Sequence, residues 1–84
     1  MFWVILFSAN IYSADSIFEA KLAAGPFPEL KTCAALGAMM VDSLNAENPY
    51  KDFRIECAPD HELKRHAGRR LYNLQELLDL LQED

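Results

Sequence analysis

Residues 33–57, CAALGAMMVDSLNAENPYKDFRIEC, begin and end with the only two cysteines of the chain. The first part of this stretch continues an apolar stripe with the i, i+3, i+4, i+7 spacing of an amphipathic helix. Pro49 ends that helix, because proline cannot continue it. Residues 51–57 then alternate between apolar and charged side chains, as a half-buried strand does. The stretch therefore predicts a helix followed by a strand, with one cysteine in each. The expected inward-facing stripe of the helix is Leu30, Cys33, Ala34, Gly37, Met40, Val41 and Leu44.

Two more strands precede the helix. Residues 2–12 are rich in β-branched and aromatic side chains, and both alternate sets start apolar, which is typical of a central strand. Residues 16–23 alternate cleanly, and the turn-forming residues between the two segments predict a β-hairpin. The sequence AGPFP, residues 24–28, is expected to break the second strand, with Pro28 in the first turn of the helix.

The expected fold class is α+β. The helix joins the second and third strands, which makes these two strands parallel, and the hairpin makes the first strand antiparallel to the second. We expect a three-stranded mixed sheet, β-β-α-β in chain order and 2-1-3 in space, with one packed helix and a C-terminal helix. Residues 1–59 form the β-β-α-β core, and residues 60–84 add a charged loop and an amphipathic helix to the same domain.

The two cysteines are expected to be neighbours at one end of the sheet. Cys33 lies near the start of the helix on its inward stripe, and Cys57 closes the third strand on the side of Phe53 and Ile55. A disulfide between them closes a loop of about 25 residues and contributes roughly 3.5 kcal/mol in the chain-entropy model. Alternatively, both thiols are reduced and pack as small apolar side chains. The sequence leaves both states open.

The C-terminal segment contains two helix-start signals. Asp60 can cap a single helical turn at 61–66 that Gly68 would end, and Asn73 can cap a helix over 74–82. Two interpretations of its leucine stripe are open. The stripe covers the second face of the sheet, where Phe2, Val4 and Leu6 need cover, or it forms a homodimer or partner interface. The leucines of this stripe are Leu74, Leu77, Leu78 and Leu81.

No catalytic constellation is recognisable in the sequence. His61 and His66 are five residues apart, so they do not share a helix face, and no nucleophile accompanies them. Two cysteines and two distant histidines do not match the spacing of a structural zinc site. We therefore expect a non-enzymatic protein with no catalytic, cofactor-binding or metal-binding residues and no cofactor.

The net charge of −5 disfavours direct binding to nucleic acid, whose affinity comes mainly from Lys and Arg on phosphates. One basic patch stands out in residues 61–70, and the segment after it is acidic. The patch can hold phosphate or an acidic partner, or pair with the acidic C-terminal helix of the same chain. The candidate partner-binding residues are Lys64, Arg65, Arg69, Arg70, Glu76, Asp79 and Glu83.

The apolar run Phe2 to Phe7 is shorter than the apolar region of a signal peptide, and no Lys or Arg precedes it. We expect a cytoplasmic protein without a membrane span, and a secreted or periplasmic location stays open.

The first 59 residues resemble a pattern in small uncharacterised bacterial and phage open reading frames. In that pattern a WVILF-type strand precedes a hairpin, a helix contains Cys33, Ala34 and Gly37, and a strand ends in Cys57-Ala58-Pro59. The resemblance implies the β-β-α-β shape and the proximity of the cysteines, and it implies no activity.

Two functional hypotheses follow. The first is a protein-binding inhibitor, encoded by a phage or mobile element and similar in composition to anti-CRISPR inhibitors, that covers a surface of a basic, nucleic-acid-binding host protein. The second is a disulfide-stabilised structural or secreted module without an inhibitory role.

Overall fold

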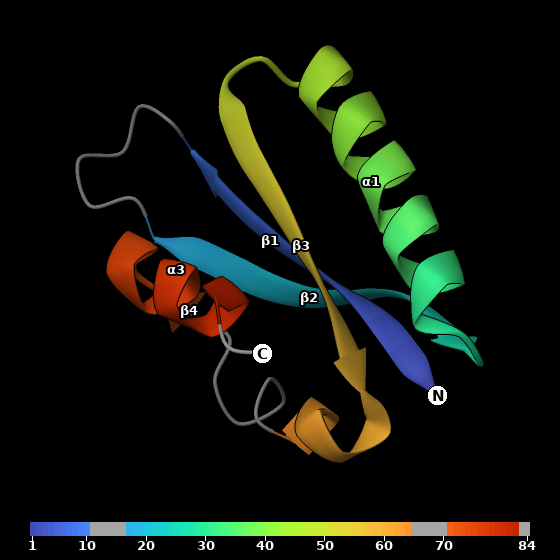
Figure 1. The fold of residues 1–84 in the computed structure, drawn as a ribbon. Helices are drawn as coiled ribbons and strands as arrows, with labels where there is room; N and C mark the ends of the chain where they lie inside the picture. The colour runs from blue at the N-terminus through green and yellow to red at the C-terminus, as the bar shows by residue number, and fades with distance from the viewer. Residues whose placement is uncertain (11–16, 65–70, 83–84) are drawn as a thin grey trace.

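The computed structural model describes residues 1–10, 17–64 and 71–82, and over these residues it is an α+β fold with one sheet and two main helices (Figure 1). The sheet has the order β3-β1-β2-β4, with helix α1 on one face and helix α3 on the other. The elements are β1 (Phe2–Asn10), β2 (Phe18–Phe27), α1 (Leu30–Glu47), β3 (Lys51–Pro59), the 3-10 helix η1 (Asp60–Glu62), β4 (Leu71–Tyr72) and α3 (Leu74–Gln82).

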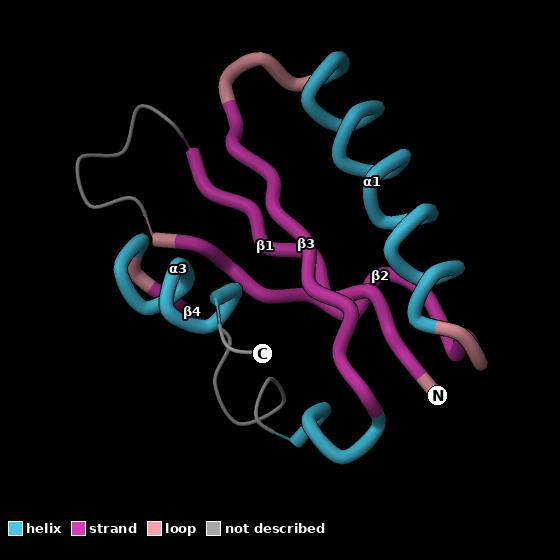
Figure 2. Tube along the Cα trace, in the orientation of Figure 1, coloured by secondary structure: helices cyan, strands magenta, loops and turns pink. Residues whose placement is uncertain are grey.

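Strand β1 lies in the interior of the sheet, between β2 and β3, as its apolar faces predict (Figure 2). It pairs antiparallel with both neighbours, and β4 pairs antiparallel with β2. The expectation of a three-stranded mixed sheet is therefore wrong, although the order 2-1-3 is contained in the observed order. Strands β2 and β3 run in the same direction, but β1 separates them, so no parallel pair forms.

Strand β2 continues beyond its predicted end. The expected break at residues 24–28 does not occur, because β2 passes through Gly25 and Pro26 and places Phe27 opposite Phe2. Gly25 has a φ of 136°, which residues with a Cβ rarely adopt. A Cβ there would also lie 2.7 Å from Cε3 of the Trp3 ring. Helix α1 consequently begins at Leu30, after Pro28 rather than with it.

Helix α1 packs on the sheet face formed by alternate residues of β1 and β3. Val4 pairs with Cys57, and cross-strand partners share a face, so both side chains lie under the helix. The buried residues of α1 are Cys33 and Gly37, and Gly37 sits directly over the side chain of Ile55. The predicted inward stripe is therefore too wide. Its other members are half-buried or exposed: Leu30, Ala34, Met40, Val41 and Leu44.

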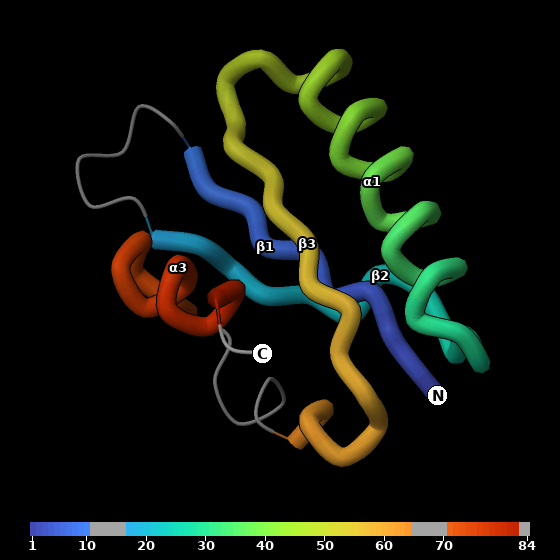
Figure 3. Tube along the Cα trace, viewed as in Figure 1, coloured from blue at the N-terminus to red at the C-terminus, as the bar shows by residue number. Residues whose placement is uncertain are grey.

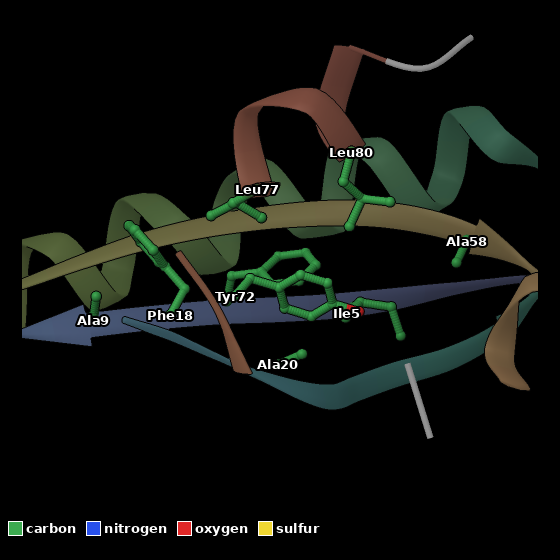
Figure 4. Close-up of a cluster of buried hydrophobic side chains, with 9 residues drawn as sticks. Ile5, Ala9, Phe18, Ala20, Ala58, Tyr72, Leu77 and Leu80 are labelled. Carbon is green, nitrogen blue, oxygen red and sulfur yellow. The ribbon is translucent and has the colours of Figure 1, made fainter. Parts of the chain in front are cut away.

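The opposite face of the sheet contains the main apolar core, covered by α3 (Figure 4). The prediction that Phe2, Val4 and Leu6 face α3 is wrong, because the register with β3 turns Val4 toward α1. The other alternate set of β1 takes that place. The buried cluster is Ile5, Phe7, Ala9, Phe18, Ala20, Ala58, Tyr72, Leu77 and Leu80.

Strand β4 was not expected from the sequence. It places Tyr72 opposite Phe18, and the rings of Tyr72 and Phe7 meet edge to face with centroids 5.7 Å apart. This contact brings the start of α3 against the β2 side of the sheet (Figure 3). A strand of two residues is too short to show a recognisable alternation of apolar and polar side chains, so the sequence pattern does not predict β4.

The segment after β3 differs from the predicted capped turn at 61–66. Pro59, rather than Asp60, is the N-cap residue of η1, and no side-chain hydrogen bond caps this 3-10 helix. Asp60 instead accepts a hydrogen bond from Trp3 Nε1 and lies 3.5 Å from the N-terminal amine of Met1. It therefore holds the N-terminus of β1 to the end of β3. Gly68, predicted to end the turn, lies outside the described residues.

Candidate binding surfaces

The two cysteines form a disulfide. It joins the first turn of α1 to β3, with the two Cα atoms 6.1 Å apart. The Cys33 side chain is fully buried between helix and sheet. The disulfide decides between the two states that the sequence left open, and it fixes α1 on the sheet. It also leaves neither sulfur as a thiol for nucleophilic chemistry or metal binding.

Helix α3 begins with the capping residue that the sequence predicts. The Asn73 side-chain oxygen accepts a hydrogen bond from the Glu76 backbone N–H at 2.8 Å, and Glu76 Oε1 accepts one from the Asn73 N–H at 3.3 Å. This reciprocal arrangement is a capping box, which satisfies backbone donors at a helix start. One of the predicted partner-binding carboxylates, Glu76, thus has a structural role in the helix itself.

The buried side of α3 faces the sheet through Leu77 and Leu80. The interpretation that the leucine stripe covers the second sheet face is therefore correct for Leu77, while Leu74 is exposed and Leu80 replaces it in the core. Because Leu77 is fully buried within the monomer, it is not available to a homodimer through the predicted stripe. Leu78 and Leu81 are half-buried.

Three of the seven candidate partner-binding residues lie in the described part of the chain. Lys64 is exposed just after η1, and Asp79 is exposed on α3, where it accepts a hydrogen bond from Gln75 Nε2 at 3.0 Å. Glu76 is half-buried in the capping box. Within the described residues, Lys64 forms no ion pair with Glu76 or Asp79. The other four fall outside the described residues: Arg65, Arg69, Arg70 and Glu83.

A surface that sequence reasoning missed lies on α1. A shallow groove with almost no polar surface runs along one flank of the helix, lined by Leu36, Met39, Met40, Ser43 and Leu44. Leu36 and Met39 lie outside the predicted inward stripe. The sequence does contain a sign of this surface, which is the scarcity of charge in the helix. The charged residues among its 18 positions are Lys31, Asp42 and Glu47. We call the five lining residues the α1 groove.

The histidines form no recognisable site within the described residues. His61 is exposed, with Nε2 4.0 Å from Glu62 Oε1, and His66 lies outside the described residues. Over residues 1–10, 17–64 and 71–82, no three His, Cys, Asp or Glu side chains gather closely enough to hold a metal ion. No helix within these ranges combines the length and apolar character needed to cross a membrane.

No family model matches the chain, and no curated protein or solved structure matches it either. The two helix surfaces and the disulfide are therefore the features of the molecule from which a function can be inferred.

Proposed function

We propose that the protein is a non-enzymatic inhibitor that binds a basic partner protein and covers a surface which that partner needs. The observation that supports this proposal most is the character of α3. Its buried leucines fix one side of the helix on the sheet, its capping box fixes its start, and its outer side presents Asp79. No Lys or Arg occurs in Leu74–Gln82, so the helix offers acidic charge alone.

A rigid acidic helix suits a basic partner for a physical reason. Complementary charge increases the rate of encounter and disfavours partners of the same sign. The net charge of −5 adds to this steering and opposes direct contact with phosphates. Proteins that bind nucleic acid display basic surfaces, which makes them the partner class that this chemistry fits. Covering such a surface prevents nucleic-acid binding, as in the anti-CRISPR type of inhibition.

The test is binding to a panel of basic nucleic-acid-binding complexes at low salt, followed by size-exclusion chromatography and nucleic-acid competition. We expect co-elution with at least one complex, loss of its nucleic-acid binding, and weakening as salt rises. The variant Asp79→Lys should bind more weakly. Glu19→Lys is the matched control, because Glu19 is also exposed but lies on β2, on the sheet face opposite α3.

Both variants change the net charge by the same amount, so a difference between them locates the contact on α3. Absence of co-elution with every complex would overturn the proposal. Equal weakening by Asp79→Lys and Glu19→Lys would contradict the assignment to α3, because it would leave overall charge as the cause.

A second candidate function is a disulfide-stabilised structural or secreted module. The Cys33–Cys57 disulfide favours it, because such bonds persist mainly in oxidising compartments. The test measures the redox state of the two cysteines in cells that express the chain. Acid stops thiol exchange, and the free thiols are then labelled. An oxidised pair in an exported protein that binds no basic partner would support the module, and a fully labelled cytoplasmic pair would exclude it.

A further inference from the structure

Helix α1, all of which lies within the described residues, has few of the features that stabilise a helix on its own. Its N-cap residue, Glu29, makes no side-chain capping hydrogen bond. Lys31 in the first turn and Glu47 in the last turn both oppose the helix dipole, and no acidic first-turn or basic last-turn residue offsets them. The C-terminal end does have a cap, because the Asn48 side chain donates a hydrogen bond to the Leu44 carbonyl at 3.1 Å. Most helical stability in proteins comes from packing, so α1 depends on its contacts with the sheet.

The buried part of α1 is small and lies beside the disulfide. Cys33 and Gly37, one turn apart, are the buried residues of the helix. The α1 groove is open on one flank, and Leu30 and Met39 are mainly exposed, so much of the apolar surface of the helix does not touch the sheet. The bond from Cys33 to Cys57 is therefore a covalent link in the middle of a limited contact. Breaking that bond leaves a weakly stabilised helix with few buried side chains to hold it.

The rest of the domain has a core to which α1 does not contribute. The large buried cluster consists of residues from the four strands and α3, on the sheet face opposite α1 (Figure 4). Strand β1 pairs with β2 on one side and with β3 on the other, and α3 has its own capping box. Helix α1 can therefore leave the sheet without opening this cluster.

We propose that the Cys33–Cys57 disulfide is a redox switch that controls the docking of α1. In the oxidised chain the helix covers Val4 and Phe53, which are 0% and 8% exposed. Phe53 pairs with Ser8, four residues from Val4 along β1, so both side chains lie on the α1 face. Reduction releases α1, which loses its helical structure and uncovers these two side chains, while the strands and α3 stay folded.

The switch does not depend on the proposed inhibitory function. Helix α3 with Asp79 lies on the opposite face of the sheet and is present in both redox states (Figure 1). Loss of partner binding and loss of redox control are therefore separate outcomes, measured by separate experiments.

The reductant is a dithiol, and the reaction consists of two thiol–disulfide exchanges. Cys57 is half-buried and Cys33 is fully buried, so a thiolate of the dithiol attacks Cys57 Sγ. A bond forms between these two sulfurs, the Cys33–Cys57 bond breaks, and Cys33 leaves as a thiolate that takes up a proton. The second thiolate of the dithiol then attacks the dithiol sulfur bound to Cys57. Cys57 leaves as a thiolate and the dithiol becomes a cyclic disulfide, so two electrons pass from the dithiol to the cysteine pair.

The test is amide exchange, followed by mass spectrometry, on the full chain before and after treatment with dithiothreitol in the absence of denaturant. In the reduced chain, the amides of Leu30–Glu47 should exchange within about 10-fold of the rate of unstructured peptide, and those of β1 at least about 10-fold more slowly than those of α1. Far-UV circular dichroism should lose more than half of its helical signal, because α1 has 18 residues and α3 has nine. Reoxidation should restore both measurements.

A charge exchange within α1 tests whether the release depends on the weakness of the helix. The double variant Lys31→Glu and Glu47→Lys keeps the net charge and makes both charges favour the dipole, so α1 in the reduced chain should exchange about 3- to 10-fold more slowly. The matched control is Glu19→Lys with Lys21→Glu, which exchanges the same charges at exposed positions of β2 and should leave α1 unchanged. Equal rates in the two double variants would contradict the dependence on helix stability.

Three other results would overturn the proposal. A disulfide that dithiothreitol reduces only in denaturant does not act as a switch in the folded chain. If the α1 amides stay protected after reduction, contacts other than the disulfide hold the helix. If β1 loses as much protection as α1, the disulfide stabilises the whole domain rather than the docking of one helix.

Discussion

The disulfide between Cys33 and Cys57 joins α1 to the edge strand of the sheet, close to the residue at which the helix begins. Because the helix buries little besides Cys33 and Gly37, this covalent bond supplies a large share of what holds α1 in place. The sheet and α3 have their own core on the other face. One face of the sheet therefore carries the large apolar cluster, and the other combines a smaller set of buried residues, among them Val4 and Phe53, with the crosslink.

Removing the disulfide should destabilise the domain strongly. The double variant Cys33→Ala and Cys57→Ala is expected to lower the free energy of unfolding by about 3–4 kcal/mol. Without the crosslink, the segment between these two residues, which are 24 positions apart, regains its conformational freedom in the unfolded chain. Urea denaturation measures the loss. Amide exchange should rise more in α1 than in β1, because α1 lacks another strong anchor.

Reduction of the native chain by a phosphine should produce a loss of similar size, and the double variant should not respond to the phosphine at all. A native chain whose unfolding curve is unchanged by reduction would contradict this account of α1.

The contact between Gly37 and Ile55 sets how closely α1 approaches the sheet. A Cβ at residue 37 would lie 2.7 Å from Ile55 Cδ1 and 3.2 Å from its Cγ1. Gly37→Ala should therefore destabilise the domain by about 1–2 kcal/mol through overpacking, although alanine is the better helix former by about 1 kcal/mol. In the background of Ile55→Val, which lacks Cδ1, the same substitution should become neutral or stabilising.

A double-mutant cycle by urea denaturation measures this coupling. Equal effects of Gly37→Ala in the two backgrounds would show that Ile55 does not set the distance between helix and sheet.

Several elements follow from local patterns that tertiary contacts do not override. The alternation in residues 51–57, the helical spacing around Cys33 and the Asn73 capping signal each predict the observed structure closely. The proximity of the two cysteines follows from the same topology. The strand, the helix and the cap depend on neighbours in the chain, which a sequence displays directly, and the cysteine contact then follows from the order of these elements.

The faces of β1 and α3 could not be assigned in this way. Both alternate sets of β1 are apolar, so the choice between Val4 and Ile5 for the α3 face depends on the pairing of Val4 with Cys57. Leucines occupy five of the nine positions of α3 and form one broad apolar side, so the sequence does not say which part of that side enters the core. The docking through β4 decides that Leu80, rather than Leu74, enters the core.

The capping box at the start of α3 should contribute measurably, because a nine-residue helix is marginal without its cap. Asn73→Ala is expected to lower the free energy of unfolding by about 1 kcal/mol through loss of the bond to the Glu76 N–H. Gln75→Ala, an exposed substitution in the same turn, should cost less than about 0.5 kcal/mol. Urea denaturation compares the two, and equal losses would argue against a role for the cap.

The two leucines Leu77 and Leu74 provide the sharpest test of how α3 docks. Leu77 is fully buried and Leu74 is 40% exposed, although both belong to the stripe visible in the sequence. Leu77→Ala should cost about 3–4 kcal/mol, because it removes apolar contacts and leaves a cavity beside Phe7 and Phe18. Leu74→Ala should cost less than about 1 kcal/mol, since solvent replaces the lost methyl groups. Leu74 is the first residue of the helix and Leu77 an interior one, but leucine and alanine differ little in helix propensity, so the difference in urea unfolding reports mainly burial. If both substitutions cost under 1 kcal/mol while α3 exchanges its amides rapidly, the helix is not part of the cooperative core.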